Sequence, residues 1–145
     1  MVIGGVEIEH THGLLGHSDA DVLTHAVIDA LLGAAGLGDI GQHFPDTDER
    51  YRGADSLELL RVTAALLAQA GCAIEHVDAT VVLEAPKLLP YRELMRARLA
   101  ASAGVAVDRI NIKATRGEGM GFVGRAEGAA ALAVATVLRP AHALP

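Results

Sequence analysis

Apolar residues recur at every third or fourth position in three stretches of the chain, and this spacing predicts amphipathic helices. The clearest stretch covers about residues 19–35, with Ser18 as the expected N-cap and Gly36 just beyond the last turn. Residues 56–70 and 91–102 show the same period and are expected to form the other two helices.

Short apolar runs, some of them alternating with polar residues, predict four strands. Residues 2–8 are strand-like but are broken by Gly4 and Gly5. Residues 128–138 fit a helix by their alanine content and a buried strand by their Val and Thr content and short length, and we favour the strand. The remaining strands are expected over residues 74–83 and 109–115.

A loop without apolar periodicity is expected over residues 38–53, which are rich in Gly, Pro and Asp. Its 16 residues exceed the length of most connections in compact domains, so it is either disordered or functional. No internal repeat or linker divides the chain. The pattern therefore predicts a single α+β domain over residues 1–139 and a loose tail over 140–145.

The composition adds two constraints. Hydrophobic residues make up 51% of the chain but aromatic residues only 3%, so the core consists of aliphatic side chains that each bury little area. Such a chain gains stability by burying apolar surface against copies of itself. The formal charge of −6, without a Lys/Arg cluster, argues against a nucleic-acid or anionic-membrane surface. Phosphate binding would then need metal ions, backbone N–H groups or a few placed cations.

The expected cell compartment follows from three further features. Cys72 is the only cysteine, which excludes an intrachain disulfide and suits a reducing compartment. The longest late apolar run, residues 128–138, is too short to span a bilayer. The first residues lack the basic region and apolar stretch of a signal peptide. We therefore expect a cytoplasmic enzyme or binding domain.

The first of four polar segments surrounds the start of the first predicted helix. His25 lies four residues from both Asp21 and Asp29, so the three share a helix face, and His17 and Ser18 precede the helix where anions bind well. This arrangement suits an imidazole metal ligand whose tautomer is fixed by the neighbouring carboxylates. It also suits a solvated polar stripe, which the residues alone favour.

Two further segments could contact a ligand. In residues 38–48, glycines free backbone N–H groups and three aspartates could hold hydroxyls, water or a divalent cation; the alternative is an ordinary acidic surface loop. In residues 84–90, two prolines fix the backbone, so that it could read the edge of a base while Lys87 meets a phosphate. The alternative there is a rigid connection with an exposed lysine.

The fourth segment is glycine-rich and covers residues 113–125. Its glycines lie among Arg116, Glu118 and Arg125, which suits either a phosphate cradle with a carboxylate for a cation or a flexible turn. It is not a P-loop, and the sequence contains no serine nucleophile elbow, cysteine pair, zinc-protease helix motif or dinucleotide fingerprint. Together the four segments indicate a phosphate-and-metal site assembled from loops.

The blocks GLLGHSDADVLTHAVIDALLGAAGLGDIGQHFPDTD, EAPKLLP, NIKAT and GFVGRAEG, read in order, resemble the 2-C-methyl-D-erythritol 2,4-cyclodiphosphate synthase family over about residues 3–138. Members cyclise a cytidine diphosphate ester of methylerythritol 2-phosphate and release CMP. The substrate's own 2-phosphate attacks the β-phosphorus, which agrees with the lack of a protein nucleophile. The resemblance implies a phosphorus–oxygen lyase of the non-mevalonate isoprenoid pathway. It also implies a mixed sheet with about three helices on one face, in a homotrimer whose sheets face the three-fold axis.

The resemblance also implies a role for each segment. His25 matches a ligand of the zinc that holds the β-phosphate, and Glu118 matches the carboxylate for a magnesium or manganese ion between the α- and β-phosphates. His17 and Ser18 match the pair that touches the phosphate of the methylerythritol arm. The remaining substrate-binding residues are Asp39, Ile40, Gly41, Phe44, Pro45, Asp46, Thr47 and Asp48 for the sugar-like part, Ala85, Pro86, Lys87, Leu88 and Leu89 for cytosine, Thr115 and Arg116 for the α-phosphate, and Phe122 and Arg125 at the channel on the trimer axis. Among these, the residues expected to act in catalysis are Arg116, His17, Asp46 and Lys87.

The sequence departs from the family pattern in two places. The resemblance implies an Asp-x-His pair of zinc ligands on a strand before Val2, and we expect that the sequence given begins after that strand. Since catalytic zinc generally needs three protein ligands, low zinc occupancy and little turnover are expected of this chain. Arg116 stands where the family usually has a second threonine, and it either binds the α-phosphate or turns outward. Two alternatives therefore stay open: a non-catalytic trimeric module that binds nucleotide or isoprenoid phosphate, and a metal-dependent phosphohydrolase.

Overall fold

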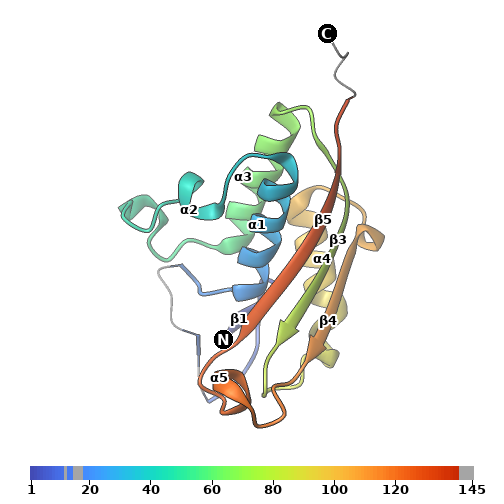
Figure 1. Ribbon diagram of the computed structural model, residues 1–145. Helices are drawn as coiled ribbons and strands as arrows, with labels where there is room; N and C mark the ends of the chain where they lie inside the picture. The colour runs from blue at the N-terminus through green and yellow to red at the C-terminus, as the bar shows by residue number, and fades with distance from the viewer. Residues whose placement is uncertain (12, 15–17, 141–145) are drawn as a thin grey trace.

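The computed structural model describes residues 1–11, 13–14 and 18–140, and its described part is built on a three-stranded sheet. The central strand β3 (Ala73–Val82) pairs in parallel with β4 (Ile110–Thr115) and antiparallel with β5 (Ala130–Leu138), as Figure 1 shows. The predicted mixed sheet is confirmed, and residues 128–138 contribute a strand rather than a helix. Because β3 and β4 are parallel, the segments that leave them emerge at the same end of the sheet.

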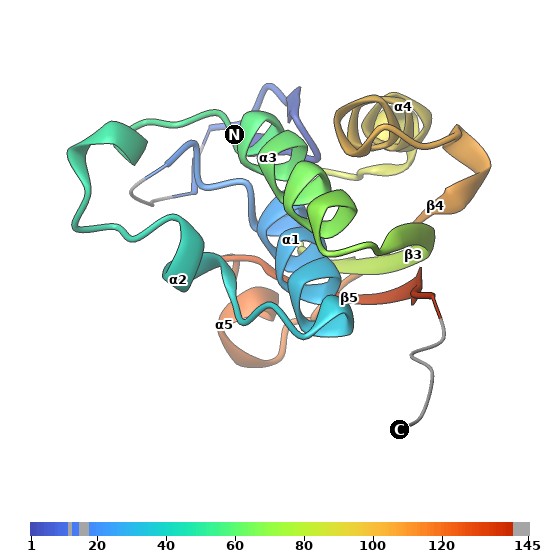
Figure 2. The same ribbon diagram turned by 90° about the horizontal axis from the view of Figure 1, so that it is seen from above.

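Three longer helices lie on one face of this sheet. Helix α1 (Val22–Ala35) packs on β5 and β3, α4 (Arg92–Ala103) packs on β4, and α3 (Ser56–Gln69) covers α1 and α4 from outside, as the view in Figure 2 makes clear. The inward face of α1 consists mainly of Leu, Ile and Val residues and is buried, which is the burial that its apolar period predicts. The described part also contains the short helices α2 (Ile40–His43) and α5 (Gly121–Gly124), and 3₁₀ turns over Glu49–Tyr51, Leu89–Tyr91 and Val107–Arg109.

The N-terminal segment is a hairpin and not one interrupted strand, so this prediction was wrong in form. Strand β1 (Val2–Ile3) turns through Gly4 and Gly5 into β2 (Val6–Glu7). Both glycines have positive φ, +57° and +69°, as the tightest hairpin turns require. A Cβ at Gly5 would lie 2.4 Å from Leu57 Cδ1, so a side chain there would also collide with α3.

Helix α1 begins later than the sequence predicts, because Asp21 and not Ser18 is its N-cap. The Asp21 side chain is completely buried and accepts hydrogen bonds from Thr24 N (3.0 Å) and Thr24 Oγ1 (2.7 Å). It also accepts from Gly4 N (2.9 Å) and Gly5 N (2.6 Å), in the hairpin turn. One carboxylate therefore caps the helix and closes the hairpin, which a search for capping residues along the sequence does not reveal.

The segment over residues 38–53 is also more regular than the predicted loop. Asp39 caps α2 by accepting from Gln42 N (3.0 Å), and Asp48 caps the following 3₁₀ turn by accepting from Arg50 N (3.0 Å). Short helices of four or fewer residues leave no apolar period, so the sequence pattern could not indicate them. The two caps use aspartates that the sequence offers as ligand-binding groups.

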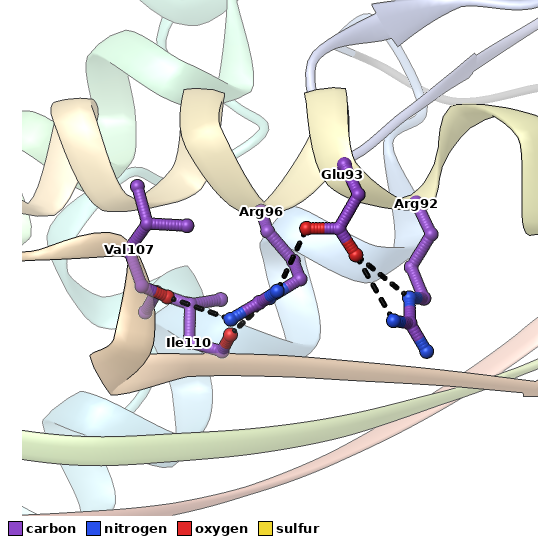
Figure 3. Close-up of polar contacts among 5 residues, drawn as sticks. All are labelled: Arg92, Glu93, Arg96, Val107 and Ile110. Atoms are coloured by element: carbon purple, nitrogen blue, oxygen red, sulfur yellow. Dashed lines mark hydrogen bonds and ion pairs between the residues drawn. The ribbon is translucent and has the colours of Figure 1, made fainter.

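Arg96 fastens α4 to the edge of the sheet, as shown in Figure 3. Its guanidinium donates to the carbonyl oxygens of Ile110 (2.7 Å) and Val107 (3.1 Å), and it forms an ion pair with Glu93 at 2.8 Å. The hydrogen bond from Arg92 to Glu93, together with the charge of Arg96, lowers the pKa of the Glu93 carboxyl. These contacts hold the start of α4 at a fixed position beside β4.

The other face of the sheet leaves large apolar side chains exposed among the described residues. On β5, Leu132, Val134 and Leu138 are 66%, 71% and 56% exposed. Alternate positions, such as Ala133 and Ala135, face the helices and pack against the core. No helix in the described ranges is long and apolar enough to cross a membrane.

Candidate functional site

A cavity of about 890 Å³ lies beside the N-terminal ends of α1 and α3. That volume falls within the range of small-molecule sites. Its polar lining includes Ser18, His25 and Asp46, and its apolar lining includes Phe44 and Leu59. Of the residues that the sequence assigns to the substrate, the cavity wall contains Ser18, Ile40, Gly41, Phe44, Pro45, Asp46 and Ala85, and it also contains His25, assigned to zinc.

His25 lies in the first turn of α1 and is half-buried. Its Nε2 atom lies 3.2 Å from Ser18 Oγ and 3.0 Å from Ser56 Oγ. One of the two interpretations of this segment, and not the one that the residues alone favour, has Asp21 and Asp29 hold this ring, and the structure contradicts it. Asp21 is taken up by the hairpin and the helix cap, while Asp29 accepts from Ile40 N at 2.8 Å. Two hydroxyl groups therefore contact the ring nitrogen in place of the carboxylates.

The aspartates of residues 38–48 have different surroundings. Asp46 is exposed and lines the cavity, whereas Asp39 and Asp48 are used as helix caps. The hydrogen bond from the Arg50 side chain holds the pKa of the Asp48 carboxyl below its usual value. Thr47 is exposed and is not part of the cavity wall, so of the three acids Asp46 is the one placed to meet a ligand in this cavity.

A second cavity of about 390 Å³ lies between the start of α4 and the edge strand β4. Leu88 and Leu89 form part of its wall together with Lys113 and Arg92. It combines apolar contact with two cationic side chains, which suits a flat apolar ring that carries a phosphate. Pro86, which follows a cis peptide bond, and the exposed Lys87 lie in the same segment but outside the two cavity walls.

The glycine-rich segment begins at the end of β4 and is tied to the end of β3. Gly117 N donates to Glu84 Oε2 (3.0 Å), and Leu83 N donates to Thr115 O (3.0 Å). A Cβ at Gly117 would lie 2.5 Å from Gly124 N, so the two ends of the loop touch through their backbones. The predicted ligand-binding side chains on this loop are all exposed: Thr115, Arg116, Glu118, Phe122 and Arg125.

Two ion pairs organise the charges on that loop. Arg116 lies 3.4 Å from Glu118, and Arg125 lies 2.8 Å from Glu127, which lines the larger cavity. The hydrogen bond to Glu127 raises the pKa of Arg125. The pairing of Arg116 with Glu118 places a cation next to the carboxylate that the resemblance assigns to magnesium or manganese.

The described residues do not form a complete zinc site. No group of three or more His, Cys, Asp or Glu side chains suitable for a metal ion occurs among them. His25 is the zinc ligand that the resemblance assigns in this region, and a catalytic zinc generally needs three protein ligands. His17, predicted to contact phosphate and to act in catalysis, lies outside the described residues.

The cavity also contains residues that the sequence analysis did not assign to it. Tyr51, Leu59, Leu83 and Gly128 contribute to its wall, and the buried Ser56, the first residue of α3, contacts His25. The sequence analysis assigns Ser56 to a helix and not to the site, and its contact with His25 joins residues 31 positions apart. No local sequence pattern reports such a contact.

The fold and the site define a class: a small α+β protein with a cavity suited to a small molecule at one end of a mixed sheet, where helix starts and loops bring together an imidazole and hydroxyl groups. The YgbB family matches residues 1–138. The 2-C-methyl-D-erythritol 2,4-cyclodiphosphate synthase of Bordetella avium (strain 197N) is 59% identical over 141 residues, which cover 97% of this chain and 87% of that protein. The chain therefore belongs to the YgbB family, the family of these synthases.

Solved structures agree with this assignment. A 2C-methyl-D-erythritol-2,4-cyclodiphosphate synthase in its CDP-bound form superposes with a TM-score of 0.84 at 35% identity, covering 95% of this chain and 89% of that one. The bifunctional IspDF of Campylobacter jejuni superposes with a TM-score of 0.90 at 42% identity, covering 94% of this chain and 37% of that longer chain. The family resemblance and the α+β fold predicted from the sequence are confirmed.

Proposed function

We propose that the chain cyclises 4-diphosphocytidyl-2-C-methyl-D-erythritol 2-phosphate to 2-C-methyl-D-erythritol 2,4-cyclodiphosphate with release of CMP. This is a phosphorus–oxygen lyase reaction of the non-mevalonate isoprenoid pathway, and we place it in the cytoplasm. The proposal rests on one observation: the chain is 59% identical to a named synthase over 97% of its own length.

In the proposed reaction an oxygen of the substrate's 2-phosphate forms a bond to the β-phosphorus. The bond between the β-phosphorus and the oxygen bridging to the α-phosphate breaks, and that oxygen leaves with CMP. No protein group needs to become bonded to phosphorus. The chain acts by holding the two phosphates in line and by neutralising their charge.

The cavity residues have matching tasks in this proposal. The Ser18 hydroxyl donates to the phosphate of the methylerythritol arm, and Asp46 accepts from the sugar-like hydroxyls. Leu88 and Leu89 contact the cytosine ring in the smaller cavity, where Lys113 lies near the phosphates. Arg116 neutralises charge on the α-phosphate with a forked guanidinium, a geometry that a threonine lacks.

We also propose two metal contacts, with His25 as one ligand of zinc and Glu118 as a ligand of magnesium or manganese. Such ions neutralise phosphate charge and polarise the phosphorus–oxygen bond. Because the described residues contain no group of three or more His, Cys, Asp or Glu side chains suited to a metal ion, we expect zinc in the purified chain to be well below one equivalent. Elemental analysis measures this, and a full equivalent that is lost in H25Q would contradict the expectation.

A homotrimer with the sheets facing its axis is part of the proposal. It is supported by the exposed apolar side of β5, where Leu132, Val134 and Leu138 would otherwise face water. Light scattering after gel filtration should give about three times the chain mass of 15.0 kDa. The variant V134K should dissociate it, whereas T136K, on the same strand and already polar, should have a smaller effect.

Phosphorus NMR during incubation with the cytidyl diphosphate substrate, zinc and magnesium tests the reaction. CMP together with a cyclic diphosphate supports the synthase. Tight binding of CDP without turnover would indicate a non-catalytic nucleotide-binding trimer. The described residues support keeping this alternative, because they contain no cluster of three metal ligands. Linear products would instead indicate a phosphohydrolase.

A further inference from the structure

We infer that Asp19 and Ser56 are positioning residues for His25. They place the imidazole proton on Nε2, so that Nδ1 keeps the lone pair that a ligand can use. The inference builds on the proposed function in treating His25 as a ligand-binding group. The location of the proton, however, follows from contacts within the chain.

The first step is the direction of the hydrogen bond between Ser56 and Asp19. The Asp19 carboxylate lies 2.5 Å from Ser56 Oγ through Oδ1 and 3.0 Å from Ser56 N through Oδ2. It also accepts from Asp21 N at 3.1 Å. Since an ionised carboxylate only accepts hydrogen bonds, the single hydroxyl proton of Ser56 points to Asp19. Ser56 is completely buried, so its hydroxyl group does not depend on solvent.

The second step follows at His25. With its proton directed to Asp19, Ser56 Oγ has only lone pairs to offer to His25 Nε2, which lies 3.0 Å away. Nε2 must then be the donor. A neutral imidazole carries one N–H group, so Nδ1 has the free lone pair. Ser18 Oγ, 3.2 Å from the same nitrogen, can share this donor and keep its own proton for a ligand in the cavity.

The same contacts hold the ring in place. Ser56 is the first residue of α3, His25 lies in the first turn of α1, and Asp19 precedes α1 and donates through its backbone N to Ala54 O at 3.2 Å. The two helix starts are therefore joined around the imidazole. Removing an outer partner of a ligand-binding histidine typically weakens ligand affinity about 10–100-fold.

Nitrogen NMR on histidine-labelled protein tests the inference without metal or substrate. The spectra are recorded at about pH 8, and H25Q identifies the His25 signals. We expect a protonated Nε2 with a slowly exchanging imidazole proton in the native chain and in S56T. In S56A that slow exchange should be lost. In D19N the new side-chain amide can donate to Ser56 Oγ, which turns the hydroxyl proton to His25 and should increase the Nδ1-protonated form.

Two results would overturn the inference. One is a native His25 protonated on Nδ1. The other is a slowly exchanging proton that survives in S56A but disappears in S18A, which would make Ser18 the residue that holds the ring. Because neither measurement needs turnover, an inactive chain in the cyclisation assay leaves this inference standing, and a wrong tautomer leaves the proposed reaction standing.

Discussion

Replacing Asp21 by asparagine should destabilise the fold by an amount that its four hydrogen bonds allow us to work out. Each carboxylate oxygen accepts two of them: Oδ1 from Gly4 N and Thr24 N, and Oδ2 from Gly5 N and Thr24 Oγ1. The least costly amide orientation keeps the oxygen at the Oδ1 position. The Thr24 hydroxyl can then rotate and accept, but Gly5 N–H loses its partner.

An unpaired N–H group costs about 1–3 kcal/mol, and the remaining bonds lose the strength that a charged acceptor gives them. We therefore expect D21N to lower the free energy of unfolding by about 2–4 kcal/mol. For a domain of this length, with an unfolding entropy of about 2 cal/mol/K per residue, that corresponds to a Tm lower by about 7–13 °C.

Thermal unfolding followed by circular dichroism at a fixed protein concentration measures the change. The matched control is D55N, because Asp55 caps α3 in an exposed position by a single bond from Leu57 N at 2.8 Å. Asparagine is as good an N-cap as aspartate, so the control should shift Tm by less than about 2 °C. A D21N protein that melts as the control does would refute the assignment of both the hairpin and the helix cap to this carboxylate.

Four further outcomes are expected. G124A should weaken CDP binding at least about tenfold by calorimetry, because the new Cβ would lie 2.4 Å from Gly119 C and displace the loop. G33A, in an open position within α1, should instead raise the free energy of unfolding by about 1 kcal/mol in urea titrations. R116T should weaken CDP binding about 10–100-fold if the guanidinium meets the phosphate, and unchanged affinity would mean that it turns outward. The hydrogen bond from Lys113 lowers the pKa of Asp78, so its stabilisation exists above the unfolded value of about 3.9 and is lost as pH falls through the lower folded value. Since the Asp78 side chain is 39% exposed, D78N should cost less than about 1 kcal/mol at pH 7, and in acid unfolding curves this cost should shrink as pH falls below about 3.9.

The sequence predicts the main helices and strands well because their signals are local. The apolar period of α1 reports its buried face directly, and the length and β-branched content of residues 130–138 correctly favour a strand. The N-cap of α1 was misplaced because Asp21 gains two of its four donors from a hairpin 16 and 17 residues earlier. Contacts of that kind decide between neighbouring capping residues and leave no local pattern.

For the site as well, the sequence indicated residues with a local signal but not the contacts between distant segments. Ser18, His25 and Asp46 were identified from the sequence and line one cavity. The interpretation in which carboxylates hold the His25 ring was wrong. Helical spacing points to acidic residues close to His25 in the sequence, whereas its Nε2 atom contacts the hydroxyl of Ser56 on α3. Spacing within one helix cannot report which residue of another helix packs against it.

The backbone contact between the two ends of the glycine-rich loop has a consequence for variation among related chains. Met120 N donates to Gly117 O (2.9 Å), and Gly124 N donates to Met120 O (3.0 Å), so the loop holds its shape without help from its outward side chains. Those side chains, Arg116 among them, can be exchanged while the backbone of the loop keeps its shape. An exchange of Arg116 for a residue with a hydroxyl group would therefore change the charge presented at this position without a change of fold.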